Sequence, residues 1–154
     1  MEIIDSLTFA LRAIITGAGG AVSRAEYQKA GELPPDKPFY VREAVIPMGA
    51  AVVNQRATRY DFVAQYDVFA RRDAFPDPAR YLHDKAGALA ALFSTPEQPF
   101  GKTLTLAGWS GVECFITAPA EIQAMGDRDG YFQVPVLLNI SVIADASAKY
   151  AVAG

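Results

Sequence analysis

The stretch that decides the fold is Arg59-Tyr-Asp-Phe-Val-Ala-Gln-Tyr-Asp-Val-Phe-Ala-Arg71, in which apolar and polar side chains alternate almost strictly. Such alternation predicts a β-strand with one dry and one wet face. At about 3.3 Å per residue the strand would span roughly 43 Å, more than twice the usual strand of about five or six residues. A strand of this length serves architecture, and we expect it to organise the domain.

A second long alternation, Tyr131–Ala144, predicts another strand of the same kind. Its apolar face is formed by Phe132, Val134, Val136, Leu138, Ile140 and Val142. Gln133, Asn139 and Ser141 fall on the opposite face. Two such strands predict a large sheet and say little about chemistry.

The segments before the first long strand predict a helix, a loop and a hairpin. Apolar residues at three- and four-residue steps between Ile3 and Ile15 indicate an amphipathic helix that ends at Gly17. The Gly- and Pro-rich stretch from Thr16 to Pro38 predicts a long loop with one turn of helix near residues 25–29. Residues 39–47 and 50–55 then predict two strands separated by a break at Met48-Gly49.

The remaining segments complete the expected order of elements. Asp77 is the predicted N-cap of a second helix with Pro78 at its first position, and this helix stops within residues 94–101. Residues 102–109 and 112–117 predict strands joined around Ser110-Gly111. These elements favour a single α+β domain over residues 1–146, followed by a C-terminal tail at 147–154. We expect an antiparallel or mixed sheet with long strands and two helices packed on one face.

Composition and charge narrow the class of protein. The 154 residues are 51% hydrophobic and 20% charged, which is an ordinary globular composition. The net charge of −3, without any long run of basic residues, argues against specific nucleic-acid binding. Cys114 is the single cysteine, so no internal disulfide can form. The acidic start of the chain and the lack of a long apolar run predict neither a secretory leader nor a membrane span.

Candidate catalytic groups are few and isolated. His83 is the single histidine, on the expected second helix, and Cys114 stands inside an expected strand, where a buried thiol is the ordinary interpretation. The stretch Gly108-Trp109-Ser110-Gly111 lacks the final glycine and the following helix of a serine-hydrolase elbow. We therefore expect no enzymatic activity, no cofactor and no metal site.

Charged side chains along the first long strand are the candidate functional residues. We expect them to belong to a polar strip that meets another subunit, although ordinary solvated strand ends would have the same composition. Asp61 and Asp67 lie about 20 Å apart by strand rise, too far to share one substrate. The candidate interface residues are Arg56, Arg59, Asp61, Asp67, Arg71 and Arg72.

The order of elements resembles the tail terminator, or tail-completion, proteins of long-tailed bacteriophages and related phage-like particles. The resemblance rests on the amphipathic first helix, the irregular stretch, the hairpin, a strand of the type Tyr60-x-Phe62-x-x-x-Tyr66-x-Val68, the Ala- and Leu-rich second helix and the closing Tyr131–Val136 strand. It covers most of residues 1–146. It rests on element order and length, so it assigns no role to an individual residue.

This resemblance implies a virion structural protein in the tail or neck, assembled in the host cytoplasm. It implies a homo-oligomer, a hexameric ring, that caps the tail tube protein, stops tube growth and contacts a head-completion or neck protein, with no membrane involved. DNA would pass through the lumen without specific binding, which suits the acidic charge balance. We expect residues 47–58 and 16–38 to be ordered by neighbouring subunits.

Two alternatives remain open at this point. One is another head–tail joining or baseplate component. The other is a small enzyme or ligand-binding domain whose pocket would be lined by Tyr60, Tyr66, Trp109 and His83.

Overall fold

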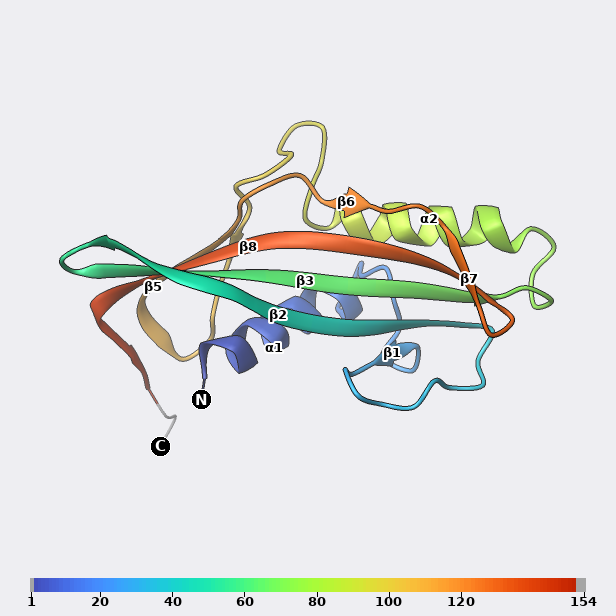
Figure 1. Cartoon of the computed structure of the whole chain (residues 1–154), viewed down its shortest axis with the longest axis horizontal. Coiled ribbons are helices and arrows are strands. Elements are labelled where there is room, and N and C mark those ends of the chain that lie inside the picture. Colours follow the sequence, from blue (N-terminus) through green and yellow to red (C-terminus); the bar gives the residue numbers. More distant parts are fainter. Residues whose placement is uncertain (1, 152–154) are drawn as a thin grey trace.

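The computed structural model, which describes residues 2–151, is built on one long mixed sheet (Figure 1). Its helices are α1 (Ile3–Thr16) and α2 (Pro78–Ala91). Its strands are β1 (Tyr27–Gln28), β2 (Phe39–Asn54), β3 (Ala57–Arg71), β4 (Thr103–Leu104), β5 (Trp109–Ile116), β6 (Glu121–Ile122), β7 (Gly126–Arg128) and β8 (Tyr131–Tyr150). The two alternating stretches of sequence are therefore the core of β3 and β8, as predicted.

The sheet is organised around β3. The strand order is β1-β2-β3-β8-β5-β4, and the short strands β6 and β7 pair with β8 beyond the end of β5. β3 pairs antiparallel with β8 without interruption from Ala57↔Asp145 to Arg71↔Tyr131. β1 pairs parallel with β2, whereas the other strand pairs are antiparallel. The structure thus confirms the α+β class and the long strands.

Both helices pack on the same face of the sheet. The inward residues of β3 and β8 alternate as the sequence predicts, and they form one hydrophobic core together with Leu7, Leu11 and Ile15 of α1 and Leu82 and Leu89 of α2. In Figure 1, β2 and β3 pass in front of α1, while α2 follows the other end of β8. The second helix starts as predicted, because Asp77 Oδ1 accepts a hydrogen bond from the Arg80 N–H at 3.2 Å and Pro78 follows.

The expected break at Met48-Gly49 was wrong, because β2 runs through it as one strand. The pairing with β3 shifts between Pro47↔Phe62 and Gly49↔Asp61, which marks a β-bulge. Gly49 has a φ of 147°, a conformation that a side chain would strain. The glycine therefore bends the strand without ending it. The expected turn of helix near residues 25–29 is also wrong, since β1 lies there and pairs with β2.

Two boundaries in the last third of the chain also differ from the prediction. The turn between β4 and β5 lies at Leu106–Gly108. Within β5 the pairing shifts from Ser110↔Lys149 to Val112↔Ala144, so Gly111 stands opposite the extra residues of a bulge in β8. Gly108 has a φ of 84°, and a Cβ there would lie 2.5 Å from the Tyr150 ring. β8 continues to Tyr150 because Trp109 and Ser110 of β5 pair with it. Residues 147–150 of the expected tail therefore belong to the sheet, and 152–154 lie outside the described residues.

Candidate assembly surface

The end of the β2–β3 hairpin projects beyond both helices. We call residues 46–58 the β2–β3 arm; it forms the left end of the molecule in Figure 1. Its large apolar side chains are exposed to solvent, with exposed fractions of 42% for Ile46, 62% for Met48, 79% for Val52 and 52% for Val53. Ile46 pairs with Val63 and Val52 with Thr58, so these two side chains lie on opposite faces of the hairpin. Several large apolar side chains in solvent at one end of a chain are typical of a segment that contacts another protein.

The arm is a regular hairpin, although no helix packs on it. Ala50 pairs with Tyr60 and Val52 with Thr58, and the Ala146 N–H donates a hydrogen bond to the Arg56 carbonyl at 2.6 Å. At the apex, Asn54 Oδ1 accepts a hydrogen bond from the Arg56 N–H at 2.7 Å. Its backbone is thus held by the hairpin ladder and by β8. The arm differs from the rest of the sheet because no helix covers its inward face.

The outer edge of β2 has no partner strand along most of its length. β1 pairs with β2 at Val41 and Arg42, and within residues 2–151 no strand pairs with this edge from Glu43 onward. Pro47 lies in this stretch. Proline lacks a backbone N–H, and it is tolerated on an edge strand because no partner strand needs that donor. An open edge of this length offers backbone donors and acceptors to another chain.

The six charged residues predicted for an interface separate into two groups at opposite ends of β3. Near the arm, Arg59 forms an ion pair with Asp61 at 3.3 Å, and Asp61 also accepts a hydrogen bond from the Ser141 hydroxyl at 2.5 Å. Arg56 forms no ion pair within residues 2–151. Asp67, farther along the same face, accepts a hydrogen bond from the Gln65 amide at 2.9 Å. This end of the strip is therefore partly paired within the chain.

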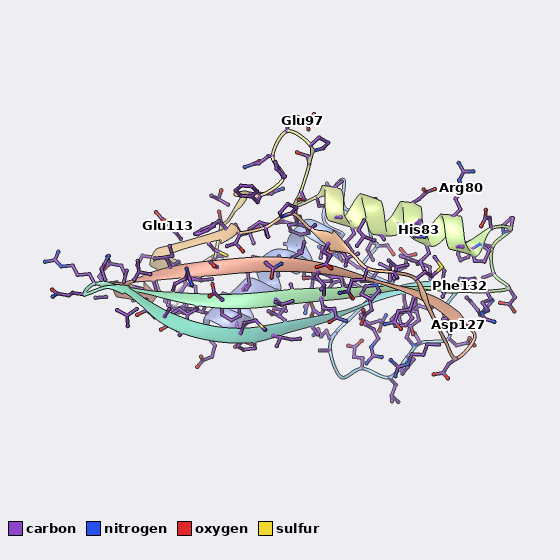
Figure 2. All side chains as sticks on the ribbon, turned by 45° about the horizontal axis from the view of Figure 1, so that its top comes forward. Arg80, His83, Glu97, Glu113, Asp127 and Phe132 are labelled. Carbon is purple, nitrogen blue, oxygen red and sulfur yellow. The ribbon has the colours of Figure 1, made fainter. Side chains whose placement is uncertain are left out.

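The other end of β3 is tied to nearby loops. Arg71 pairs with Asp73 at 2.7 Å and with Asp36 at 3.6 Å. Arg72 pairs with Asp127 on β7, and its guanidinium lies 5.2 Å from the ring centroid of Phe132. Figure 2 labels Asp127 and Phe132 at this end of the sheet. Asp67 is not among the carboxylates that pair with Arg71, because those of Asp36 and Asp73 lie closer to the arginine. These contacts give Arg71 and Arg72 a role within the chain itself.

A buried ion pair between α1 and β2 was missed by the sequence interpretation. Glu43 is 5% exposed, and Arg12 Nη2 donates a hydrogen bond to Glu43 Oε1 at 3.1 Å. Tyr66 pairs opposite Glu43 in the sheet and is fully buried, and the Arg12 guanidinium lies 5.2 Å from the ring centroid of Tyr27. Burial raises the pKa of Glu43, and the neighbouring Arg12 partly offsets that rise.

A signal for this ion pair was present in the sequence. Phe39, Val41, Glu43 and Val45 stand at alternate positions, so Glu43 occupies an inward site of an otherwise apolar face. A carboxylate in such a place needs a buried cation or a protonated state. Arg12, next to Leu11 on the buried stripe of α1, supplies the cation.

The residues of the alternative pocket do not come together. Tyr66 is fully buried in the core, whereas His83 lies exposed on α2 (Figure 2). Trp109 Nε1 donates a hydrogen bond to the Ser6 hydroxyl at 2.9 Å. Tyr60 and Trp109 line an open hollow of about 390 Å³ at the start of α1. These four residues therefore do not form one pocket.

Cys114 and the acidic side chains are the remaining candidates for chemistry. Cys114 is 3% exposed, and burial raises its pKa to about 12, so the thiol stays protonated near neutral pH. Across residues 2–151, no group of three or more His, Cys, Asp or Glu side chains is arranged to hold a metal ion. Over the same residues, no helix combines the length and apolar character needed to cross a membrane.

Comparison with known proteins supports the fold. One solved protein structure, whose name describes no activity or partner, superposes with a TM-score of 0.65 and 21% sequence identity. The match covers 90% of this chain and 94% of that chain. No family model and no curated protein matches the sequence. The structural similarity therefore extends over nearly the whole of both chains. At this level of sequence identity it shows a shared fold.

Proposed function

We propose that this protein is a virion structural subunit of the tail terminator kind. In this role it assembles as a hexameric ring on the end of the tail tube, stops polymerisation of the tube protein and joins the tail to a head-completion or neck protein. DNA passes through the lumen without specific binding. The protein functions in the tail or neck of the virion after assembly in the host cytoplasm.

The observation that carries this proposal is the uncovered β2–β3 arm beside the open edge of β2. An apolar arm with Met48, Val52 and Val53 in solvent suits a subunit whose surface is completed by other chains. The order of elements, which resembles that of tail terminators, also supports the proposal. Met48, Val52 and Val53 belong to the β2–β3 hairpin, which is one of the elements in that order. The acidic charge balance suits a wall along which DNA slides.

Assembly on tail tubes is the direct test. Native mass spectrometry and negative-stain imaging of the purified protein, alone and with tail tubes, should detect a ring on the tube end facing the head. If ring closure needs the tube as a template, the protein is monomeric without tubes. Binding to tube ends is therefore the result that tests the proposal. A protein that leaves tube ends bare and stays monomeric is not a terminator, and one that binds at the baseplate end is another joining component.

Limited proteolysis provides a second test. Residues 47–58 and 16–38 should become resistant to cleavage when the ring forms, because neighbouring subunits cover them. Unchanged cleavage in both segments after assembly would contradict a ring built through these surfaces.

A further inference from the structure

A second apolar surface lies on the helix side of the molecule. A groove of about 610 Å³ runs between α1 and the segment that carries β4, and we call it the α1 groove. It is lined by Phe9, Ala10, Ala13, Ile14, Leu104 and Tyr150, among others. Phe9 is 64% exposed, a large fraction for an aromatic side chain beside an apolar hollow. The groove thus has the dimensions and lining to accept a few apolar side chains.

Acidic side chains precede the groove-lining residues of α1. Asp5 stands four residues before Phe9, which places both on one face of the helix, and Glu2 is the residue at which the helix is capped. Glu2 and Asp5 are exposed, and neither forms an ion pair within the described part of the chain. The α1 groove therefore has an apolar floor, with negative charge on the residues of α1 that precede it.

The apex of the β2–β3 arm has the complementary composition. Val52 and Val53 present apolar side chains, and the polar sequence Asn54-Gln55-Arg56 follows directly. Arg56 is the one ionisable side chain in residues 46–58. The apex of the arm therefore carries apolar side chains next to a single positive charge. The α1 groove carries apolar side chains next to negative charge, so the two surfaces are complementary.

The arm cannot reach the groove of its own chain. The hairpin ladder and the pairing of Ala57 with Asp145 of β8 hold it in line with the sheet. Figure 1 shows its apex at one end of the long axis, away from α1. A contact between two different patches of identical chains is head-to-tail, and such contacts build rings when the rotation closes.

We propose that the apex of the β2–β3 arm of one copy binds in the α1 groove of a second copy. Val52 and Val53 occupy the apolar floor, and Arg56 pairs with Asp5 at the start of α1. This inference rests on the proposed function, for which it names the surfaces that join neighbouring subunits.

Cysteine cross-linking tests the contact directly. One sample carries Val53→Cys and a second, of different size, carries Ala13→Cys, and the two are mixed under assembling conditions, with tail tubes where these are needed. Oxidation should join the two chains in the assembly. Val53→Cys mixed with Glu97→Cys, on the exposed loop that follows α2 (Figure 2), is the matched control and should remain unlinked. Buried Cys114 leaves the thiol background low.

A charge exchange tests the polar end of the contact. Arg56→Asp should weaken assembly roughly tenfold, because it places a negative charge against the acidic start of α1. Asp5→Arg should do the same and also weaken the start of α1, since Asp5 lies at the positive end of the helix dipole. Arg56→Asp combined with Asp5→Arg should restore assembly to within about threefold of the unmodified protein.

The outcomes separate this inference from the proposed function. Rings that form on tubes without the Val53–Ala13 cross-link, and that are insensitive to the charge exchange, would overturn the inference and leave the terminator role intact. Rings that form normally with arm or groove variants but no longer bind tubes would show that a different protein occupies these surfaces, which also overturns it. Failure of the unmodified protein to assemble or to cap tubes would overturn both.

Discussion

The two halves of β2 differ in an unusual way: the first half buries a charged side chain, and the second half exposes apolar side chains. In the half that α1 covers, residues 39–45, the carboxylate of Glu43 is 5% exposed. In the half that forms the arm, Val52 is 79% exposed and Met48 is 62% exposed. The strand and its partner β3 are continuous through both halves. Whether a side chain of β2 is buried therefore depends on whether a helix covers that part of the strand. It does not follow from the hydropathy of the side chain.

This contrast separates a stable base from an open arm. The covered half holds its charge because Arg12 on α1 reaches it, so the ion pair also fixes α1 on the sheet. The arm gains its order from backbone pairing alone, which needs no apolar contact to a helix. Substitutions in the base should therefore change folding stability, whereas substitutions in the arm should change assembly.

The largest effect on stability is expected from removing the cation of the buried pair. Arg12→Met keeps the length of the side chain but leaves Glu43 buried without its partner. We expect a loss of about 3 kcal/mol in the free energy of unfolding at neutral pH, because an uncompensated buried charge is costly. Urea unfolding followed by circular dichroism measures this loss. The loss should shrink at mildly acidic pH, where Glu43 takes up a proton.

A double substitution is the control for this prediction. Arg12→Met combined with Glu43→Leu replaces both charges with apolar groups, and it should recover most of the lost stability. Equal stability of Arg12→Met and the unmodified protein would mean that the pair contributes nothing to anchoring α1. The base would then depend on apolar contacts alone.

A matched pair of valine substitutions compares base and arm directly. Val68 on β3 is fully buried, and Val68→Ala should lower the free energy of unfolding by about 2–3 kcal/mol through lost burial and a cavity. Val52→Ala in the arm should change it by less than about 0.5 kcal/mol. Both are measured by urea unfolding at a concentration at which the chain is monomeric. Similar losses for the two variants would contradict the view that the arm packs against nothing in its own chain.

The sequence predicted those parts of the fold that depend on periodicity. The alternation in β3 and β8, the apolar stripe of α1 and the Asp77-Pro78 start of α2 are local patterns, and each appears in the structure as expected. Gly49 was misinterpreted because a glycine two residues after a proline signals a turn and a bulge equally well. The difference depends on whether β3 continues to pair on the other side, and such pairing is not local.

The candidate surface was less accessible to sequence reasoning than the fold. Four of the six charged residues lie on β3, and Arg56 and Arg72 flank it. Asp36, Asp73 and Asp127, which all lie outside β3, decide how Arg71 and Arg72 are paired within the chain. Exposure of the arm depends on the end of α1 in space, which no pattern within β2 encodes. The inward position of Glu43 was the one unused signal, since its place in the alternation already implied a buried partner.

The smallest expected effect concerns the pH dependence that Glu43 gives to the base. Burial raises the pKa of Glu43 in the folded protein above its ordinary value of 4.5, so between these two values the folded chain binds a proton that the unfolded chain releases. The stability that this proton provides is complete below the ordinary value and is lost as the pH rises through the folded-state pKa. Glu43→Gln does not titrate. The stability of the unmodified protein relative to this variant should therefore decrease as the pH rises from 4.5, which urea unfolding at pH 4 to 8 measures. A difference that increases with pH would mean that Arg12 outweighs burial, and that the covered half of β2 favours the ionised carboxylate.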